Sequence, residues 1–187
     1  MEREVYTMYK FLNVHPEGKL VPDCVKRAIT LAAEMDYKEV QLELNRHKKL
    51  TGAKTFNEDK NWKSYIENVL EGRKLSFPAV KGMPRMNGER FCKAYPKGRY
   101  ILSMAGHLSC CVDGVIYDTW DCQQKCVYQA YRISPRIKHY YTVNKVKNEN
   151  RYLIEIHEGT EKKVFDAAKD ELKGMVKCLE LMHFERK

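Results

Sequence analysis

Residues 99–120 read RYILSMAGHLSCCVDGVIYDTW, and they hold three short apolar runs separated by turn residues. The runs span residues 99–104, 107–112 and 115–119. Asp113-Gly114 lies between the last two runs, where an Asp-Gly pair is typical of a two-residue hairpin turn. Counting back from this turn sets His107 opposite Trp120 and leaves Asp118 diagonal to His107 on the same face. The stretch therefore predicts an antiparallel sheet that brings an imidazole and a carboxylate together.

Helices are predicted before this sheet. Asp23 is a good N-cap, and the apolar residues that follow it repeat at helical spacing. These residues are Val25, Ala28, Ile29, Ala32 and Met35. A second helix is predicted after Asp36, and a third over residues 57–71, closed by Gly72. Residues 126–133 are rich in strand-forming side chains and predict a further strand of the sheet.

The composition changes after Ser134-Pro135. Two strand-like stretches follow, over residues 140–146 and 152–157. An apolar stripe at helical spacing then predicts a helix from about residue 166 to 183. The stripe comprises Val164, Phe165, Ala168, Leu172, Met175, Val176, Leu179 and Met182. The sequence thus predicts an α+β protein, with N-terminal helices packed on an antiparallel sheet over residues 1–134 and a ββα extension over residues 135–187.

Composition narrows the class of protein. The chain has 187 residues, of which 43% are hydrophobic, so it can bury a core and is not disordered. No apolar run approaches the roughly 20 residues that a membrane span needs, and the polar start does not resemble a signal peptide. Seven cysteines at irregular positions do not form a disulfide framework. We therefore expect a soluble protein of the cytoplasm, without membrane association.

Positive charge is concentrated in the middle of the chain. The net charge is +9, and residues 45–99 hold 14 basic and 5 acidic side chains. A surface of this kind attracts an acidic macromolecular partner, and salt weakens that attraction. Scattered lysines also serve simply as a solvated surface. Both interpretations of residues 45–99 remain open from the sequence.

Three residues are candidates for covalent chemistry. Cys24 follows the N-cap at a helix start, where free backbone N–H groups and the helix dipole stabilise a thiolate. His107 opens a strand at the rim of the sheet, and Asp118 is placed to hold its imidazole. Each residue alone has an ordinary structural explanation: a small buried cysteine, an edge histidine, a solvated carboxylate. Together they favour a nucleophilic site.

The order of these residues resembles the papain-like cysteine protease fold, in which a cysteine at a helix start precedes a histidine and an orienting residue on an antiparallel sheet. Asp118-Thr119-Trp120 is similar to the Asn-Ser-Trp of papain-type enzymes. The resemblance is closest to small, uncharacterised phage and bacterial proteins of the papain-like, bacteriocin-processing-peptidase-like kind. It covers roughly residues 10–132. Three passages carry it. The first is Asn13-Val14-His15-Pro16, and the second is Asp23-Cys24-Val25-Lys26-Arg27-Ala28-Ile29. The third runs from Pro96-Lys97-Gly98-Arg99-Tyr100 through Gly106-His107-Leu108 to Asp118-Thr119-Trp120-Asp121.

The resemblance implies a nucleophile at Cys24, a general base and acid at His107, and an orienting carboxylate at Asp118. It also implies that Trp120 shields the contact between His107 and Asp118 and lines the cleft. An enzyme of this kind needs no cofactor. It would cleave an amide bond in a protein or peptide through an acyl-enzyme.

The oxyanion-stabilising group departs from the family pattern. Papain-type enzymes have a glutamine six residues before the cysteine, and this chain has Gly18 there. Asn13 is the nearest side-chain amide and is the candidate donor, and His15 is a candidate for lining the cleft. A zinc site built from the remaining cysteines is disfavoured, because adjacent strand cysteines point to opposite faces, and we expect no metal.

Two functions from different classes follow. The first is a thiol hydrolase, a cysteine peptidase or amidase, that uses Cys24, His107 and Asp118. The second is a catalytically weak or inactive scaffold of the same fold that binds or inhibits an acidic partner through residues 45–99, as a phage-encoded inhibitor would.

Overall fold

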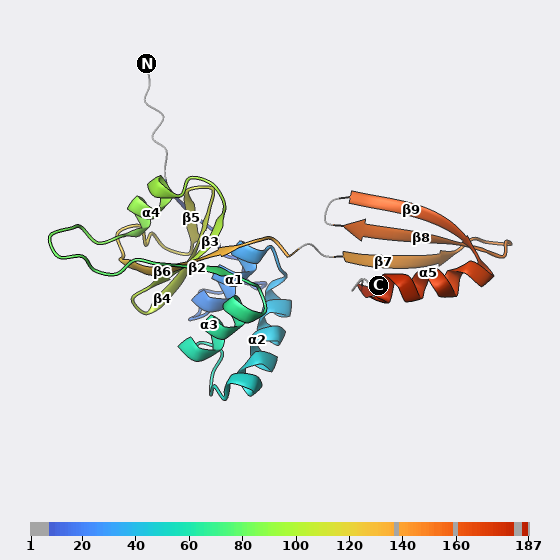
Figure 1. Ribbon diagram of the computed structural model, residues 1–187, viewed down its shortest axis with the longest axis horizontal. Helices are drawn as coiled ribbons and strands as arrows, with labels where there is room; N and C mark the ends of the chain where they lie inside the picture. The colour runs from blue at the N-terminus through green and yellow to red at the C-terminus, as the bar shows by residue number, and fades with distance from the viewer. Residues whose placement is uncertain (1–7, 137–138, 159–160, 182–184, 187) are drawn as a thin grey trace, which may run out of the picture. The chain divides into compact units, whose positions relative to one another are not determined.

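The computed structural model describes residues 8–136, 139–158, 161–181 and 185–186. The chain divides into two compact units, Met1–Arg136 and Ile137–Lys187. Both mix helices with strands (Figure 1), so the predicted α+β class is confirmed. Each unit is described by itself below.

The first unit is built on a six-stranded sheet in the order β1-β5-β4-β3-β6-β2. Its strands are β1 (Tyr9–Phe11), β2 (Arg73–Ser76), β3 (Arg99–Met104), β4 (His107–Val112), β5 (Val115–Asp118) and β6 (Val127–Ile133). The β4–β5 hairpin has the predicted register, with Cys110 opposite Tyr117 and Val112 opposite Val115. Asp113 and Gly114 have φ angles of 46° and 76°, the left-handed pair that a two-residue turn of this type requires.

One edge of the sheet was not predicted. Strand β1 pairs in parallel with β5, and Phe11 lies opposite Asp118. All other pairs in this sheet are antiparallel. The sheet is therefore mixed rather than purely antiparallel. At three residues β1 is too short to show an alternating pattern in the sequence.

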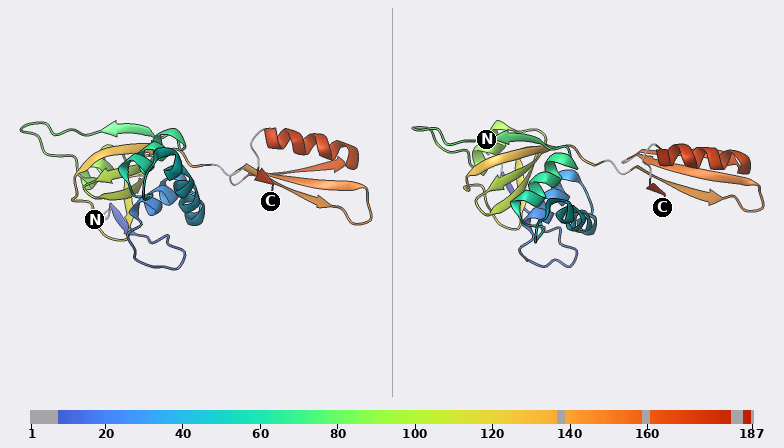
Figure 2. Two further views of the ribbon diagram at one scale, coloured as in Figure 1. Left: turned by 90° about the horizontal axis from the view of Figure 1, so that it is seen from below. Right: turned by 60° about the horizontal axis from the view of Figure 1, so that its bottom comes forward.

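The described residues of this unit form the helices α1 (Cys24–Ala33), α2 (Tyr37–Thr51), α3 (Asp59–Asn68) and α4 (Gly88–Ala94). Asp36 caps α2, because its side chain accepts hydrogen bonds from the backbone N–H groups of Lys38 and Glu39. Figure 2 shows α1, α2 and α3 gathered together against the sheet. Burial of Ile29 and Ala32 from α1 against Ile101 and Cys110 forms the first core.

Alternate residues of β3 serve two different cores. Ile101 packs into the cluster with α1, whereas Tyr100 and Leu102 pack into a second cluster with Phe91 and Cys92 of α4. Successive side chains of a strand point to opposite faces, so the sheet has α1 on one face and α4 on the other. The site described below therefore rests on a sheet that is buried on both faces.

The second unit contains β7 (His139–Lys145), β8 (Arg151–Glu158) and β9 (Glu161–Ala168) in an antiparallel sheet. Helix α5 (Lys169–Leu181) covers it, and β10 (Glu185–Arg186) pairs in parallel with β7. Tyr141, Ile154 and Leu179 form its core. Among the described residues, in both units, no helix is long and apolar enough to cross a membrane.

The predicted ββα order of this extension is wrong, because β9 is a third strand. Val164 and Phe165 were assigned to the helical stripe, but they lie in β9, and α5 begins only at Lys169. Apolar residues at 164, 165, 168 and 172 fit a helical spacing, and pairing with β8 overrides it. Met182 lies outside the described residues.

Candidate active site

Cys24 is the first residue of α1 and is partly buried. It lines one cavity with His107 and Leu108, and the groups that act on its thiol are His107 and the backbone of Leu108 and Val25. Burial alone would raise the pKa of this thiol. The hydrogen bond from His107, the two backbone N–H groups and the charge of the imidazolium outweigh burial, so the pKa of Cys24 is lowered. The surroundings of Cys24 therefore favour its thiolate form.

His107 lies between this sulfur and a carboxylate. Its Nε2 is 2.7 Å from Oδ2 of Asp118, and Nδ1 is the ring nitrogen that this carboxylate does not engage. Burial would lower the pKa of the imidazole, but hydrogen bonds to Asp118, Cys122 and Cys24 and the Asp118 charge raise the pKa of His107 to about 11. The lowered pKa of the thiol and the raised pKa of the imidazole both favour a thiolate beside an imidazolium. The ring of Trp120 covers His107, with ring centroids 5.0 Å apart.

Asp118 ends β5 and is 3% exposed. Its second oxygen, Oδ1, accepts a hydrogen bond of 2.7 Å from the backbone N–H of Thr119. Burial would raise the pKa of Asp118, but hydrogen bonds from His107, Ser109 and Thr119 and the His107 charge lower it. The carboxylate is held ionised and in a fixed orientation, as an orienting residue must be.

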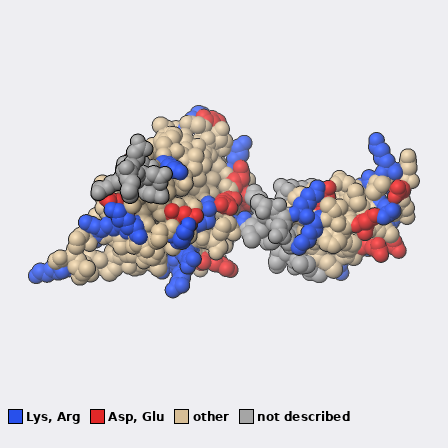
Figure 3. All heavy atoms as spheres, turned by 90° about the horizontal axis from the view of Figure 1, so that it is seen from above, with Lys and Arg blue, Asp and Glu red and all other residues tan. Residues whose placement is uncertain are grey.

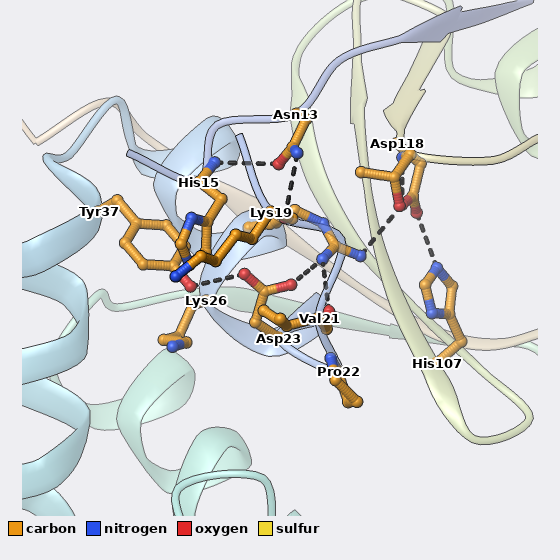
Figure 4. Close-up of polar contacts among 12 residues, drawn as sticks. Asn13, His15, Lys19, Val21, Pro22, Asp23, Lys26, Tyr37, His107 and Asp118 are labelled. Atoms are coloured by element: carbon orange, nitrogen blue, oxygen red, sulfur yellow. Dashed lines mark hydrogen bonds and ion pairs between the residues drawn. The ribbon is translucent and has the colours of Figure 1, made fainter. Parts of the chain in front are cut away.

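A buried arginine from α1 connects this carboxylate to the residue before the nucleophile. Nη2 of Arg27 is 3.6 Å from Oδ1 of Asp118, and its Nη1 pairs with Asp23. The same Nη1 donates to the carbonyl of Val21 at 3.2 Å. The hydroxyl of Tyr37 donates to Oδ2 of Asp23 at 2.5 Å. Figure 4 shows these contacts running from Tyr37 through Asp23 to Asp118 and His107.

The sequence analysis missed this network. Arg27 follows Cys24 by three residues, so both lie on one side of α1, and that spacing was the available signal. Arg27 and Asp23 are 6% and 1% exposed. A helix whose buried side carries an arginine is unusual enough to mark a structured site, because charged side chains are rarely buried unless paired.

A cavity of about 520 Å³ opens beside Cys24 and His107. Its other lining residues include Pro22, Asn57, Trp62, Lys63, Met104 and Tyr128. The volume lies in the range of ligand-binding pockets, and the wall mixes aromatic and aliphatic surface with a few polar groups. Both candidate reacting groups thus face a space that can hold a substrate side chain or backbone.

Three other predicted site residues are placed differently. The side-chain amide of Asn13 donates to the carbonyls of Gly18 and Lys19, and its oxygen accepts from the N–H of His15. Asn13 therefore closes its own loop, and the prediction that it faces an oxyanion is not supported. The ring of His15 packs on Tyr37 at 5.2 Å. Neither His15 nor Trp120 is among the residues that line the cavity, although Trp120 contacts the His107 ring.

One group of side chains has the composition of a metal site. The ligand atoms of His107, Asp118 and Cys122 lie within 4.8 Å of one another. These atoms already contact each other: Sγ of Cys122 is 3.8 Å from Oδ2 of Asp118, which bonds His107. A metal ion here would have to displace the contact between His107 and Asp118. The chemistry of this cluster is therefore that of the imidazole and carboxylate pair.

Comparisons of the chain with protein-family models, with curated proteins and with solved structures find no match. The interpretation of the site accordingly depends on its geometry and on the chemistry of its residues.

Proposed function

We propose that this protein is a papain-like thiol hydrolase that cleaves an amide bond in a polypeptide through an acyl-enzyme at Cys24. The observation that carries the proposal is that Cys24 and His107 line one cavity, with His107 bonded to Asp118. The lowered pKa of the thiol and the raised pKa of the imidazole agree with it. A nucleophile, a base and an orienting group in hydrogen-bond contact are the signature of nucleophilic catalysis.

The reaction proceeds in two halves. The Cys24 thiolate attacks the carbonyl carbon of the amide, and the carbonyl π electrons move onto oxygen. His107 gives its Nδ1 proton to the leaving nitrogen as the C–N bond breaks, which leaves a thioester on Cys24 and a neutral imidazole. His107 then takes a proton from water, the hydroxide attacks the thioester, and the carboxylic acid product leaves as the thiolate and imidazolium re-form. Asp118 holds the imidazole throughout.

Backbone N–H groups are the donors that the site offers to the oxyanion. The backbone N–H groups of Val25 and Leu108 are among the groups that lower the pKa of the Cys24 thiol. The N-terminus of α1 adds the positive end of its dipole at the same place. These donors take the place of the side-chain amide that Asn13 does not supply.

Free thiols also bear on the cellular setting that we propose. The cysteines of this chain are unpaired, and Cys92 and Cys111 remain thiols with their sulfurs 3.6 Å apart. Such thiols persist in a reducing compartment, so we place the enzyme in the cytoplasm.

The proposal is tested by the rate at which iodoacetamide alkylates Cys24, measured by mass spectrometry as a function of pH. The exposed Cys178 on α5 provides an internal reference in the same sample. We expect Cys24 to react at pH values below the ordinary thiol pKa of about 8.5, and His107→Ala to move its midpoint upward because the imidazolium is gone.

A matched control is His47→Ala. His47 is as buried as His107, but it contacts Ser64 on α3 rather than Cys24, so its loss should leave the Cys24 profile unchanged. Equal profiles for wild type and His107→Ala would contradict the ion pair. Hydrolysis itself is then followed with a peptide library, where products that form with wild type and not with Cys24→Ala identify the substrate.

The second candidate function is a binding protein on the same scaffold. It is favoured by the use of Asn13 within its own loop, which leaves the oxyanion site without the side-chain amide that the sequence analysis assigned to it. A Cys24→Ala protein that retains full biological effect would select this function over the hydrolase.

A further inference from the structure

An extended loop leaves the sheet beside the candidate active site. We call residues 78–85 the arm. The chain departs where the N–H of Phe77 bonds the carbonyl of Tyr128, and it returns where the carbonyl of Met86 accepts from Val127, both at 2.9 Å. Every residue of the arm is exposed. Figures 1 and 2 show it projecting away from the rest of the first unit.

The arm begins at the same end of the sheet as His107. One row of paired residues crosses four strands there, running from Ser76 through Gln129 and Ser103 to Leu108, the neighbour of His107. Three steps between strands span roughly 14 Å. Gln129, Ser103 and Leu108 also line the cavity. A chain lying in the cavity along this row would therefore reach the base of the arm.

The arm carries positive charge and no negative charge. Residues 72–88 include Arg73, Lys74, Lys81 and Arg85 but no Asp or Glu. Among the residues that the structure describes, Lys81 and Arg85 are in no ion pair. Figure 3 shows Lys and Arg side chains on the projecting arm.

A further cation lies between the arm and the site. Nζ of Lys125 donates to the carbonyl of Ala105 at 3.0 Å and lies 5.4 Å from the ring centroid of Trp120. The carbonyl of Lys125 accepts from the N–H of Gly88, just past the arm. Positive charge thus continues from the arm to the rim of the cavity.

Two apolar side chains stand among these cations. Val80 and Met83 are 55% and 67% exposed, and they alternate with Lys81 and Arg85 along the arm. Exposing these apolar side chains to water is unfavourable, and a loop that served only as a solvated surface would have polar residues there. A partner that supplies both negative charge and apolar contacts fits this pattern.

We propose that the arm binds an acidic, partly apolar segment of the polypeptide substrate, outside the bond that is cleaved. This inference rests on the proposed function, and it adds the substrate class. An extended chain rises about 3.3 Å per residue, so roughly 14 Å along the sheet places the bound segment about four or more residues from the scissile bond. Recognition at this distance gives specificity without crowding Cys24.

A nucleic acid fits the arm less well than a polypeptide does. Single-stranded nucleic acids are held by aromatic side chains on which bases stack, and residues 78–85 contain none. Val80 and Met83 have no role against a phosphate backbone, whereas aliphatic side chains of a peptide pack on them. The position beside a cavity for amide chemistry favours the polypeptide for the same reason.

The test measures binding in Cys24→Ala protein, so that turnover does not interfere. The probe is a fluorescein-labelled 16-residue peptide of four Glu-Leu-Gly-Glu repeats, and the comparison probes are the same peptide with Lys for Glu and a 16-nucleotide single-stranded DNA. We expect the double change Lys81→Glu and Arg85→Glu to weaken binding of the acidic peptide roughly tenfold or more at low salt. Val80→Ser with Met83→Ser should weaken it by a smaller factor.

The matched control is Lys38→Glu with Lys49→Glu on α2. It makes the same change in net charge at two exposed positions that do not line the cavity, and it should alter the affinity less than twofold. Arm variants that bind the acidic peptide as tightly as the parent protein would overturn the inference, and so would tighter binding of the DNA than of the peptide.

Failure of the arm and failure of the proposed function are read from separate measurements. The pH profile of Cys24 alkylation in the arm variants of the otherwise wild-type protein depends on His107 and not on Lys81 or Arg85. An ordinary thiol pKa for Cys24 therefore refutes the proposed hydrolase function. An affinity for the acidic peptide that the arm substitutions leave unchanged refutes the role of the arm in binding.

Discussion

Replacing Arg27 by glutamine tests whether the buried network holds the candidate site together. The guanidinium stands between Asp23 and Asp118, and all three side chains are 7% exposed or less. Arg27→Gln leaves two buried carboxylates without their shared cation. Arg27→Lys keeps the positive charge but lacks the planar guanidinium that contacts both carboxylates and the Val21 carbonyl.

The size of the effect follows from burial. Removing one partner of a buried ion pair costs about 3–5 kcal/mol, because the other charge stays behind without compensation. The first unit, Met1–Arg136, has an unfolding entropy of roughly 0.29 kcal/mol/K at that length, so Arg27→Gln should lower its Tm by roughly 10–17 °C. Arg27→Lys should lose about half as much.

Thermal unfolding by circular dichroism and Cys24 alkylation at pH 7 are the two measurements. A merely structural arginine would change the Tm alone. If Arg27 positions Asp118, alkylation of Cys24 in the folded variant also slows, because a carboxylate free to turn holds the imidazolium less firmly, and lysine restores part of the rate. Arg46→Gln, at an exposed position of α2, is the control and should shift the Tm by about 1 °C or less. A Tm for Arg27→Gln within 2 °C of wild type would refute the reasoning.

Three further predictions concern the same site. Asp118→Asn should bring the His107 pKa well below about 11 in an NMR titration, because the charge is lost while burial remains. The pKa of His107 in the folded protein, about 11, exceeds the ordinary histidine value of about 6.5. The stability from the imidazolium–Asp118 pair is therefore complete below about pH 6.5 and is lost as the pH rises toward about 11. The Tm difference between wild type and Asp118→Asn should shrink over that interval. Tyr37→Phe removes a hydrogen bond to the buried Asp23 carboxylate and should cost about 1.5–3 kcal/mol in chemical denaturation, whereas an unchanged midpoint would show that the hydroxyl contributes nothing.

Local signals made much of the site predictable. The Asp113-Gly114 turn fixes a register from which the diagonal placement of His107 and Asp118 follows by counting, and the structure has that register. The N-cap signal at Asp23 likewise predicts the start of α1 at Cys24, although the Asp23 side chain makes no capping hydrogen bond and instead contacts Tyr37 and Arg27. Both features depend on a few neighbouring residues, which is why a single sequence contains them.

One local assignment was wrong, and two features that depend on distant contacts were missed. Asn13 was assigned to the oxyanion from its distance in sequence to Cys24, but a local loop uses its amide. Strand β9 was assigned to a helix because the apolar spacing of its residues fits either structure, and only pairing with β8 decides. Arg27 shows its role only when α1 and β5 are both in place, since its two carboxylate partners are far apart in the sequence.

The unpredicted strand β1 also bears on the proposed catalysis, because it pairs with Asp118. The N–H of Leu12 donates to the carbonyl of Asp118 at 2.9 Å, and Phe11 is its partner in the parallel pair. Asp118 is thus fixed through its backbone by β1, through one carboxylate oxygen by Thr119, and through the other by His107. An imidazole is kept in a productive orientation only if the carboxylate that holds it does not move. The backbone pairing with β1 and the carboxylate contacts with Thr119, His107 and Arg27 supply that rigidity. A change in β1 that leaves Cys24 and His107 intact should therefore still slow the hydrolysis that we propose.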